Sequence, residues 1–286
     1  MNDLLATRSP DPSAVAAPPR MWALWSAAAL AATAAMLHTF VQADPTIDAL
    51  MAGDADPESQ QGLRMMWHGM SAIAWTYPVV LLLLRHRPAT VTRPVLGCVA
   101  LLNGSQAVLF AATALWVDGA SWPASVPEWA LHGPVAVLAW LARPSNGPKP
   151  RARRTRGRLV LLWCALMIAA LNAIFHTVSG TLQSWPDALL DSDTASGPKL
   201  TLYSMWLFSC VVFCAIPVTM VWSRRTSAAA ARFLLRYLAA LVAALGVSWA
   251  GAIAFGLGPD LTPVGPVSLG LLATLTALSA PTAGGE

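Results

Sequence analysis

The chain contains 286 residues, of which 56% are hydrophobic and 11% are charged, with a net charge of +4 at neutral pH. Soluble domains carry about 25% charged residues, so this composition excludes a soluble enzyme and a disordered protein. Its charged side chains are too few to cover a folded chain of this length with a polar surface. The composition therefore predicts an all-α protein whose solvent is the lipid bilayer.

The N-terminal residues 1–20 are polar and rich in proline, and we expect them to form a disordered cytoplasmic tail. The apolar stretch after Arg20 is too long for a cleavable signal peptide and lacks a small-residue cleavage site. We therefore expect this stretch to remain as the first membrane-spanning helix.

A spanning helix needs about 20 mainly apolar residues, and this template fits the chain repeatedly. The expected spans are residues 21–42, 64–84, 95–117, 127–142, 159–180, 200–222, 233–256 and 263–280. The fourth and eighth spans are short, and each contains a Gly-Pro pair that can kink a helix or move its start. The sequence thus predicts a polytopic membrane protein with about eight transmembrane helices.

The basic residues predict the orientation, because Lys and Arg accumulate on the cytoplasmic side of membrane proteins. With the N-terminus inside, every Lys and Arg except Arg64 and Lys199 falls on the cytoplasmic side. The basic segment 143–158 is explained by topology and by attraction to anionic lipid, without a nucleic-acid partner. We expect a multi-pass protein of the bacterial inner membrane with both termini in the cytoplasm.

An internal repeat is the most informative feature of the sequence. Residues 23–42 align without gaps on residues 161–180, and the alignment pairs His38-Thr39 with His176-Thr177. Further matches follow in order: Asp48-Ala49-Leu50 with Asp187-Ala188-Leu189, Met66-Trp67 with Met205-Trp206, Pro78-Val79 with Pro217-Val218, and Gly133-Pro134-Val135 with Gly265-Pro266-Val267. We expect two four-helix repeats, 21–142 and 159–280, joined by the cytoplasmic linker 143–158. Because each repeat has an even number of spans, the two should be parallel, related by a pseudo-twofold axis along the membrane normal.

Histidines are the main candidates for a functional site, since polar residues in or near a span are functional candidates by default. Four of them are expected near the outer leaflet: His38, His68, His132 and His176. In the second repeat, Leu207 replaces His68 and Val264 replaces His132. The first repeat is therefore expected to carry the site, and the second to act as a scaffold.

The sequence does not decide whether such a site would bind a haem or a transition-metal ion. Imidazole is the commonest ligand of zinc, copper and haem iron. The thioethers of Met65, Met66 and Met70, which cluster near His68, would suit copper(I), although gap-filling in a helix bundle explains these methionines more simply. No HExxH, HxxxH or CxxCH motif is present in the sequence. The alternative interpretation is that histidines and tryptophans only anchor the helices at the membrane interface.

Amides inside the spans suggest a second kind of site. Asn103, Gln106 and Asn172 lie within expected helices, where polar groups must find partners or line a cavity. A cavity between the repeats lined by these three residues would suit a carrier or binding protein for a small lipophilic molecule.

One local sequence pattern is similar to a pattern found in other membrane proteins. A His-Thr pair at the end of a helix is followed, after an acidic loop, by Met-Trp-His-Gly-Met-Ser-Ala-Ile-Ala-Trp at residues 66–75. This pattern resembles small uncharacterised four-helix bacterial membrane proteins, and the chain is similar to a tandem fusion of two such units. The resemblance implies no particular chemistry, and the second half departs from it at Leu207.

These observations lead to one functional hypothesis and two alternatives. The leading hypothesis is an inner-membrane protein whose first repeat binds a metal or haem at its histidines, with a redox role towards a membrane quinone. The alternatives are the carrier for a lipophilic molecule and a structural subunit that binds a partner protein in a larger membrane complex.

Overall fold

The computed structural model describes residues 19–118, 129–145, 155–182, 185–255 and 264–282. Every regular element within these ranges is a helix, which confirms the all-α prediction. Most of the expected tail 1–20 and of the expected linker 143–158 lies outside the described residues.

Six helical segments are long and apolar enough to cross a membrane. They are α1 (Met21–Met36) with the π-helical turn η2 (Leu37–Val41); α3 (Pro57–Leu84); α4 (Ala89–Asp118); α7 (Arg156–Ile174) with the π-helical turn η4 (Phe175–Ser179) and α8 (Gly180–Leu182); α10 (Ser196–Ser223); and α11 (Ala228–Ala254). These helices support a multi-pass membrane protein.

The expected fourth and eighth spans correspond to two shorter helices, α6 (Trp129–Leu141) and α12 (Val264–Leu278). Their 13 and 15 residues give lengths of about 20 and 22 Å at the usual helical rise. A bilayer core is about 30 Å thick, so the described parts of α6 and α12 are too short to cross it alone. The count of eight spans therefore stays a prediction.

Several helices begin before their expected spans because polar caps, and not apolar residues, mark their starts. The carboxylate of Asp56 accepts a hydrogen bond from the backbone N–H of Ser59 at 2.9 Å, and Pro57 occupies the first turn of α3. The hydroxyl of Ser227 accepts one from the backbone N–H of Ala230 at 3.2 Å and caps α11. Apolar segments of the sequence therefore underestimate the lengths of these helices at their N-terminal ends.

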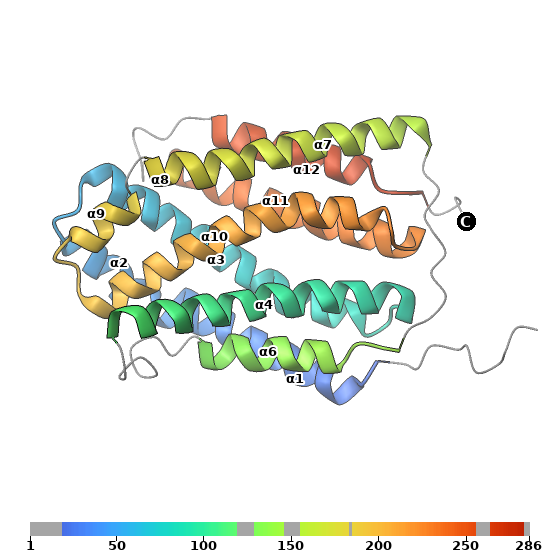
Figure 1. The fold of residues 1–286 in the computed structure, drawn as a ribbon, viewed down its shortest axis with the longest axis horizontal. Coiled ribbons are helices and arrows are strands. Elements are labelled where there is room, and N and C mark those ends of the chain that lie inside the picture. Colours follow the sequence, from blue (N-terminus) through green and yellow to red (C-terminus); the bar gives the residue numbers. More distant parts are fainter. Residues whose placement is uncertain (1–18, 119–128, 146–154, 183–184, 256–263, 283–286) are drawn as a thin grey trace, which may run out of the picture.

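Four long helices, α3, α4, α10 and α11, form the centre of the molecule (Figure 1). Helices α1 and α6 cover one side of this central group, and α7 and α12 cover the other. The first half of the chain contacts the second half chiefly where α4 packs on α10 and α3 packs on α11. The largest fully buried side chains come from these central helices: Trp67, Tyr77, Phe110 and Phe208.

The outer helix faces are strongly apolar, as a bilayer requires. Leu101 is 68% exposed, Val218 67% and Val247 72%. A soluble protein rarely exposes large contiguous apolar surfaces, so these faces are suited to lipid.

The two ends of the bundle differ in charge. The basic end contains the α3–α4 and α10–α11 turns, and its described charged side chains are Arg20, Arg85, Arg87, Arg93, Arg143, Arg156, Arg158, Arg224, Arg225, Arg232 and Arg236. The opposite, acidic end contains two short helices, α2 (Ala43–Ala52) and α9 (Trp185–Asp191), where the sequence analysis expected loops. Leu50 and Leu189 anchor these helices, since both are fully buried.

Candidate functional site

A small cavity with polar groups in its lining lies among helices of the first half of the chain, and α10 of the second half closes it. Its volume is about 20 Å³, which is room for one water molecule or one ion. The lining residues come from α1 with η2, α3, α4, α6 and α10: Ala34, His38, Met70, Ile73, Ala74, Tyr77, Gln106, His132 and Phe208.

The π-helical turn η2 carries His38 to this cavity. The imidazole stacks on the indole of Trp67, with 4.1 Å between the ring centroids and 24° between the planes. Trp67 itself is fully buried and fixes the ring from one face. Within the described part of the chain, Nε2 of His38 is buried without a hydrogen-bond partner. Isolated π-helical turns are frequent at functional sites, and sequence patterns did not reveal this one.

His132 reaches the same cavity from α6 and is held by Asn103 of α4. Nδ1 of His132 and Oδ1 of Asn103 are 3.0 Å apart. Because the amide nitrogen of Asn103 donates to the carbonyl of Val99 at 3.0 Å, the oxygen is the atom that faces the ring. Nδ1 of His132 must then be the donor, which leaves Nε2 of a neutral ring with its lone pair.

Two further polar side chains line the cavity without using all of their polar atoms. Oε1 of Gln106 and the hydroxyl of Tyr77 are buried, and neither has a hydrogen-bond partner among the described residues. An unsatisfied buried polar atom costs about 1–3 kcal/mol. Together with Nε2 of His38, these atoms come from three different helices around one small space. Such an arrangement favours a small polar or ionic guest.

The structure brings together only two of the four expected histidines. His68 is exposed on α3 and does not line the cavity. His176 lies in the second half, where its Nε2 is 2.7 Å from the hydroxyl oxygen of Ser209 and its ring stacks on Phe213 at 4.3 Å. No group of three or more His, Cys, Asp or Glu side chains in the described ranges is placed to hold a metal ion, so any site at His38 and His132 needs other donors.

The three expected cavity amides do not share one cavity. Gln106 lines the small cavity, and Asn103 serves as the partner of His132. Asn172 donates to the carbonyl of Ile168 and accepts a hydrogen bond from Ser268 at 2.8 Å, which joins α7 to α12. Asn172 therefore has a structural role within the second half.

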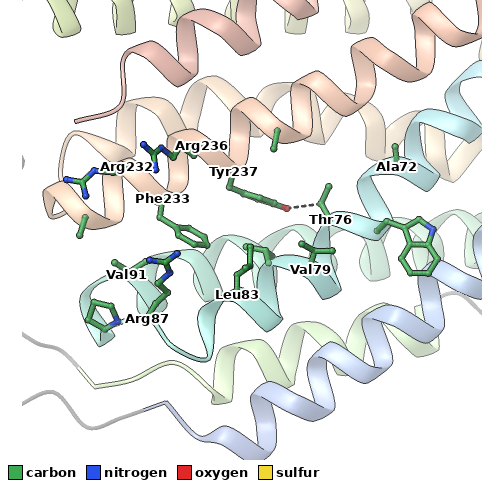
Figure 2. Close-up of a pocket in the computed structure, with 15 residues that line it drawn as sticks. Ala72, Thr76, Val79, Leu83, Arg87, Val91, Arg232, Phe233, Arg236 and Tyr237 are labelled. Atoms are coloured by element: carbon green, nitrogen blue, oxygen red, sulfur yellow. Dashed lines mark hydrogen bonds between the residues drawn. The ribbon is translucent and has the colours of Figure 1, made fainter. Parts of the chain in front are cut away.

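A larger groove runs between α3 and α11, where the two halves of the chain meet (Figure 2). Its volume is about 600 Å³. The hydroxyls of Thr76 and Tyr237 are 3.0 Å apart across it, and three arginines, Arg87, Arg232 and Arg236, lie towards the basic end. No sequence pattern predicted this groove, although Arg232 and Arg236 share one helix face at four-residue spacing.

Comparisons with protein-family models, with curated proteins and with solved structures find no match to this chain. The resemblance to small four-helix bacterial membrane proteins therefore stays a prediction.

Proposed function

We propose that this chain is a bacterial inner-membrane protein whose first half binds one transition-metal ion between His38 and His132. The observation that carries the proposal is that two imidazoles, from η2 and from α6, line one cavity of ionic size. Gln106 and Tyr77 line the same cavity and contribute buried oxygen atoms without partners.

The donor set favours copper. Imidazole binds zinc, copper, iron and nickel, whereas thioether ligands select copper(I). The side chain of Met70 lines the cavity and is buried, so a thioether accompanies the two imidazoles. The hydrogen bond from His132 to Asn103 is the kind of outer contact that orients a metal-binding histidine. A bound copper ion would supply one-electron redox chemistry.

A haem is a poor fit to the same space. A haem needs a slot many times larger than the cavity of about 20 Å³. Of the two cofactor classes expected from the sequence, the geometry supports the single metal ion.

The proposal includes two parallel repeats, with both termini at the cytoplasmic face. Helices α3 and α10 each contain 28 residues, and η2 and η4 are five-residue π-helical turns with a His-Thr pair at the same place. Matching cation–π contacts join Arg85 to Trp25 at 5.7 Å and Arg224 to Trp163 at 5.2 Å. The arginines gathered at the basic end support a cytoplasmic location of that end.

Under this duplication, the second half lacks an equivalent site. The positions of Tyr77, Gln106 and His132 correspond to Ile216, Leu245 and Val264, which supply no metal donors. Phe213 stands where the first half has Ala74, and its ring packs on His176. The counterpart of the cavity is thus occupied by an aromatic side chain, and a single metal ion per chain is expected.

The test is metal loading of the purified protein. Detergent-solubilised protein is incubated with copper(I) under reducing conditions, freed of excess metal and analysed for copper content. We expect about one ion per chain, lost in His38→Ala and in His132→Ala. Asn103→Leu should weaken binding about 10- to 100-fold, because outer contacts of metal ligands have effects of this size. Zinc loaded in parallel should bind more weakly than copper.

His176→Ala and His68→Ala are the matched controls, since the first removes the equivalent histidine of the second half and the second removes an exposed one. Both should keep full copper binding. Copper loss in His176→Ala equal to that in His38→Ala would contradict the proposed location. The thermal unfolding midpoint of each variant is measured as well. Only variants whose midpoint equals that of the wild type are compared for copper content, so that loss of metal is not confused with unfolding.

A further inference from the structure

The groove between α3 and α11 combines apolar walls with a cationic end. Val79 and Leu83 of α3 face it, and they are 54% and 52% exposed. Phe233 and Val91 continue the apolar lining towards the basic end (Figure 2). Because exposed apolar residues of a spanning helix face lipid, this groove opens towards the acyl chains of the bilayer.

The cationic end consists of three arginines that line the groove, Arg232 and Arg236 on α11 and Arg87 on the other side of Phe233 (Figure 2). The guanidinium of Arg87 lies over the ring of Phe233 at 5.6 Å. Arg232 donates from Nε to the carbonyl of Pro281 at 2.8 Å and from Nη2 to the carbonyl of Thr282, so its other N–H groups are the ones left for a guest. Arg236 lies one turn further along α11. The carboxylates of the described residues lie at the acidic end, about 40 Å away along the 28 residues of α3. The described part of the chain therefore offers these cations no acidic partner.

The size of the groove suits a lipid-sized guest. Its volume of about 600 Å³ lies within the usual range of about 300–1,000 Å³ for ligand sites. The small side chains of Ala72 and Ala240 leave the space open, and the Thr76–Tyr237 hydrogen bond crosses it. Arginine is well suited to phosphate because its planar guanidinium donates two parallel hydrogen bonds.

The corresponding contact between α4 and α10 shares part of this cationic cluster. Under the proposed duplication, Arg232 corresponds to Arg93, and each of the two donates to the carbonyl of a proline, Pro281 and Pro144. Arg87 corresponds to Thr226 and Arg236 to Gly97, beside which the guanidinium of Arg143 lies. The groove between α3 and α11 therefore differs by the presence of Arg87 and Arg236 in its own lining.

We propose that the groove between α3 and α11 binds one anionic phospholipid, with its phosphate at Arg87, Arg232 and Arg236 and an acyl chain along Val79 and Leu83. The phosphate meets cations that have no carboxylate partner among the described residues, and the apolar walls replace neighbouring lipid tails. This site is separate from the proposed metal site and does not depend on it.

The test measures lipid retained by the full-length protein. Native mass spectrometry of protein titrated with phosphatidylglycerol, and in parallel with phosphatidylcholine, gives the occupancy of the first lipid bound. We expect one tightly bound phosphatidylglycerol and weaker binding of phosphatidylcholine. Each arginine near a phosphate contributes about fivefold in affinity, so the double variant Arg87→Gln/Arg236→Gln should bind phosphatidylglycerol at least tenfold more weakly.

Two further variants make the result specific. Arg20→Gln/Arg225→Gln removes two exposed arginines from the same end but outside the groove, and it should retain the lipid. Ala240→Trp leaves all charges in place but fills the apolar part of the groove, and it should lose the lipid.

Equal losses in both double variants would overturn the proposal in favour of general charge attraction. Undiminished binding in Ala240→Trp would also overturn it, because the lipid would then lie outside the groove. Glycerol 3-phosphate that competes as strongly as phosphatidylglycerol would assign the arginines to a free phosphate ester and overturn the lipid assignment.

Discussion

Asp54 and Asp193 exchange hydrogen bonds across the acidic end of the molecule. The backbone N–H of Asp54 donates to Oδ1 of Asp193 at 3.0 Å, and the backbone N–H of Asp193 donates to Oδ1 of Asp54 at 2.9 Å. Each residue lies in the segment between a short helix and a long one, α2 and α3 for Asp54, α9 and α10 for Asp193. Such a self-complementary contact is typical of equivalent segments that meet across a twofold axis, which supports the proposed duplication.

Removal of one carboxylate from this pair should loosen the contact between the two halves. In Asp54→Ala the N–H of Asp193 loses its acceptor, whereas Asp54→Asn keeps an oxygen at that place and also removes the repulsion between two carboxylates. A hydrogen bond of this kind contributes about 1 kcal/mol, so amide exchange at Asp193 should accelerate about fivefold in the alanine variant. Hydrogen exchange read by mass spectrometry measures this rate. Equal exchange in the alanine and asparagine variants would mean that the pair does not hold the segments together.

The cap of α3 predicts a dependence of stability on pH. Hydrogen bonds from the side chain and the backbone N–H of Ser59 lower the pKa of Asp56. Because the pKa of Asp56 is lower in the folded state than in the unfolded state, the ionised carboxylate stabilises the fold. This stabilisation is fully present at pH values above about 3.9, the ordinary pKa of an aspartate, and it is lost as the pH falls through the pKa of the folded state. The thermal unfolding midpoint should therefore fall below about pH 4 more steeply in the wild type than in Asp56→Asn, whose amide caps without titrating. Parallel curves for the two proteins would refute this assignment.

Gly180 is expected to tolerate no side chain. A Cβ atom at this position would overlap the indole of Trp206, whereas one at Gly157 would meet nothing within 4 Å. Both glycines lie in helical segments, so the helix propensity gained from alanine is similar. Gly180→Ala should cost about 1–3 kcal/mol through overpacking, and Gly157→Ala should be neutral or stabilising. Thermal unfolding of the two variants in one detergent compares them directly, and a stable Gly180→Ala protein would show that Trp206 can move freely.

A large side chain placed in the first-half cavity should abolish the proposed metal site. Ala74 lines the cavity, and its counterpart Phe213 already fills the equivalent place beside His176. Ala74→Phe should lose copper binding and also lower the unfolding temperature, because the added ring is larger than the cavity of about 20 Å³ and overpacking costs about 1–3 kcal/mol. The reciprocal variant Phe213→Ala should lose about 3–5 kcal/mol of stability yet gain no second copper ion, because Ile216 and Leu245 offer no donor. A second equivalent of copper in that variant would show that donors other than Tyr77 and Gln106 suffice.

The sequence was informative about the helices because spanning segments leave long apolar runs. It did not reveal the π-helical turns at His38 and His176, since such a turn depends on one shifted backbone hydrogen bond and not on composition. It also missed α2 and α9, whose short amphipathic patterns are interrupted by prolines and acids. The caps at Asp56 and Ser227 have recognisable sequence signals, and attention to them predicts the early starts of α3 and α11.

The structure places residues that share a helix face together at the candidate site and places residues out of helical phase away from it. Met70, Ile73 and Tyr77 lie at spacings of three and four residues on the cavity face of α3. His68 is two residues before Met70, about 200° around the helix, so it faces away from them. Which histidine meets His38 depended on the packing of α1 against α6, a non-local contact that no pattern within a single helix encodes.

Under the proposed duplication and metal site, the packing of α4 on α10 and of α3 on α11 has an evolutionary consequence. Two identical subunits that meet through these surfaces would be compelled to carry the same side chains at both equivalent places, so a residue such as Phe213 would close both cavities at once. Joined in one polypeptide, the halves hold each other at a high effective concentration, and each is free to diverge. One half can then specialise in binding while the other becomes a rigid partner.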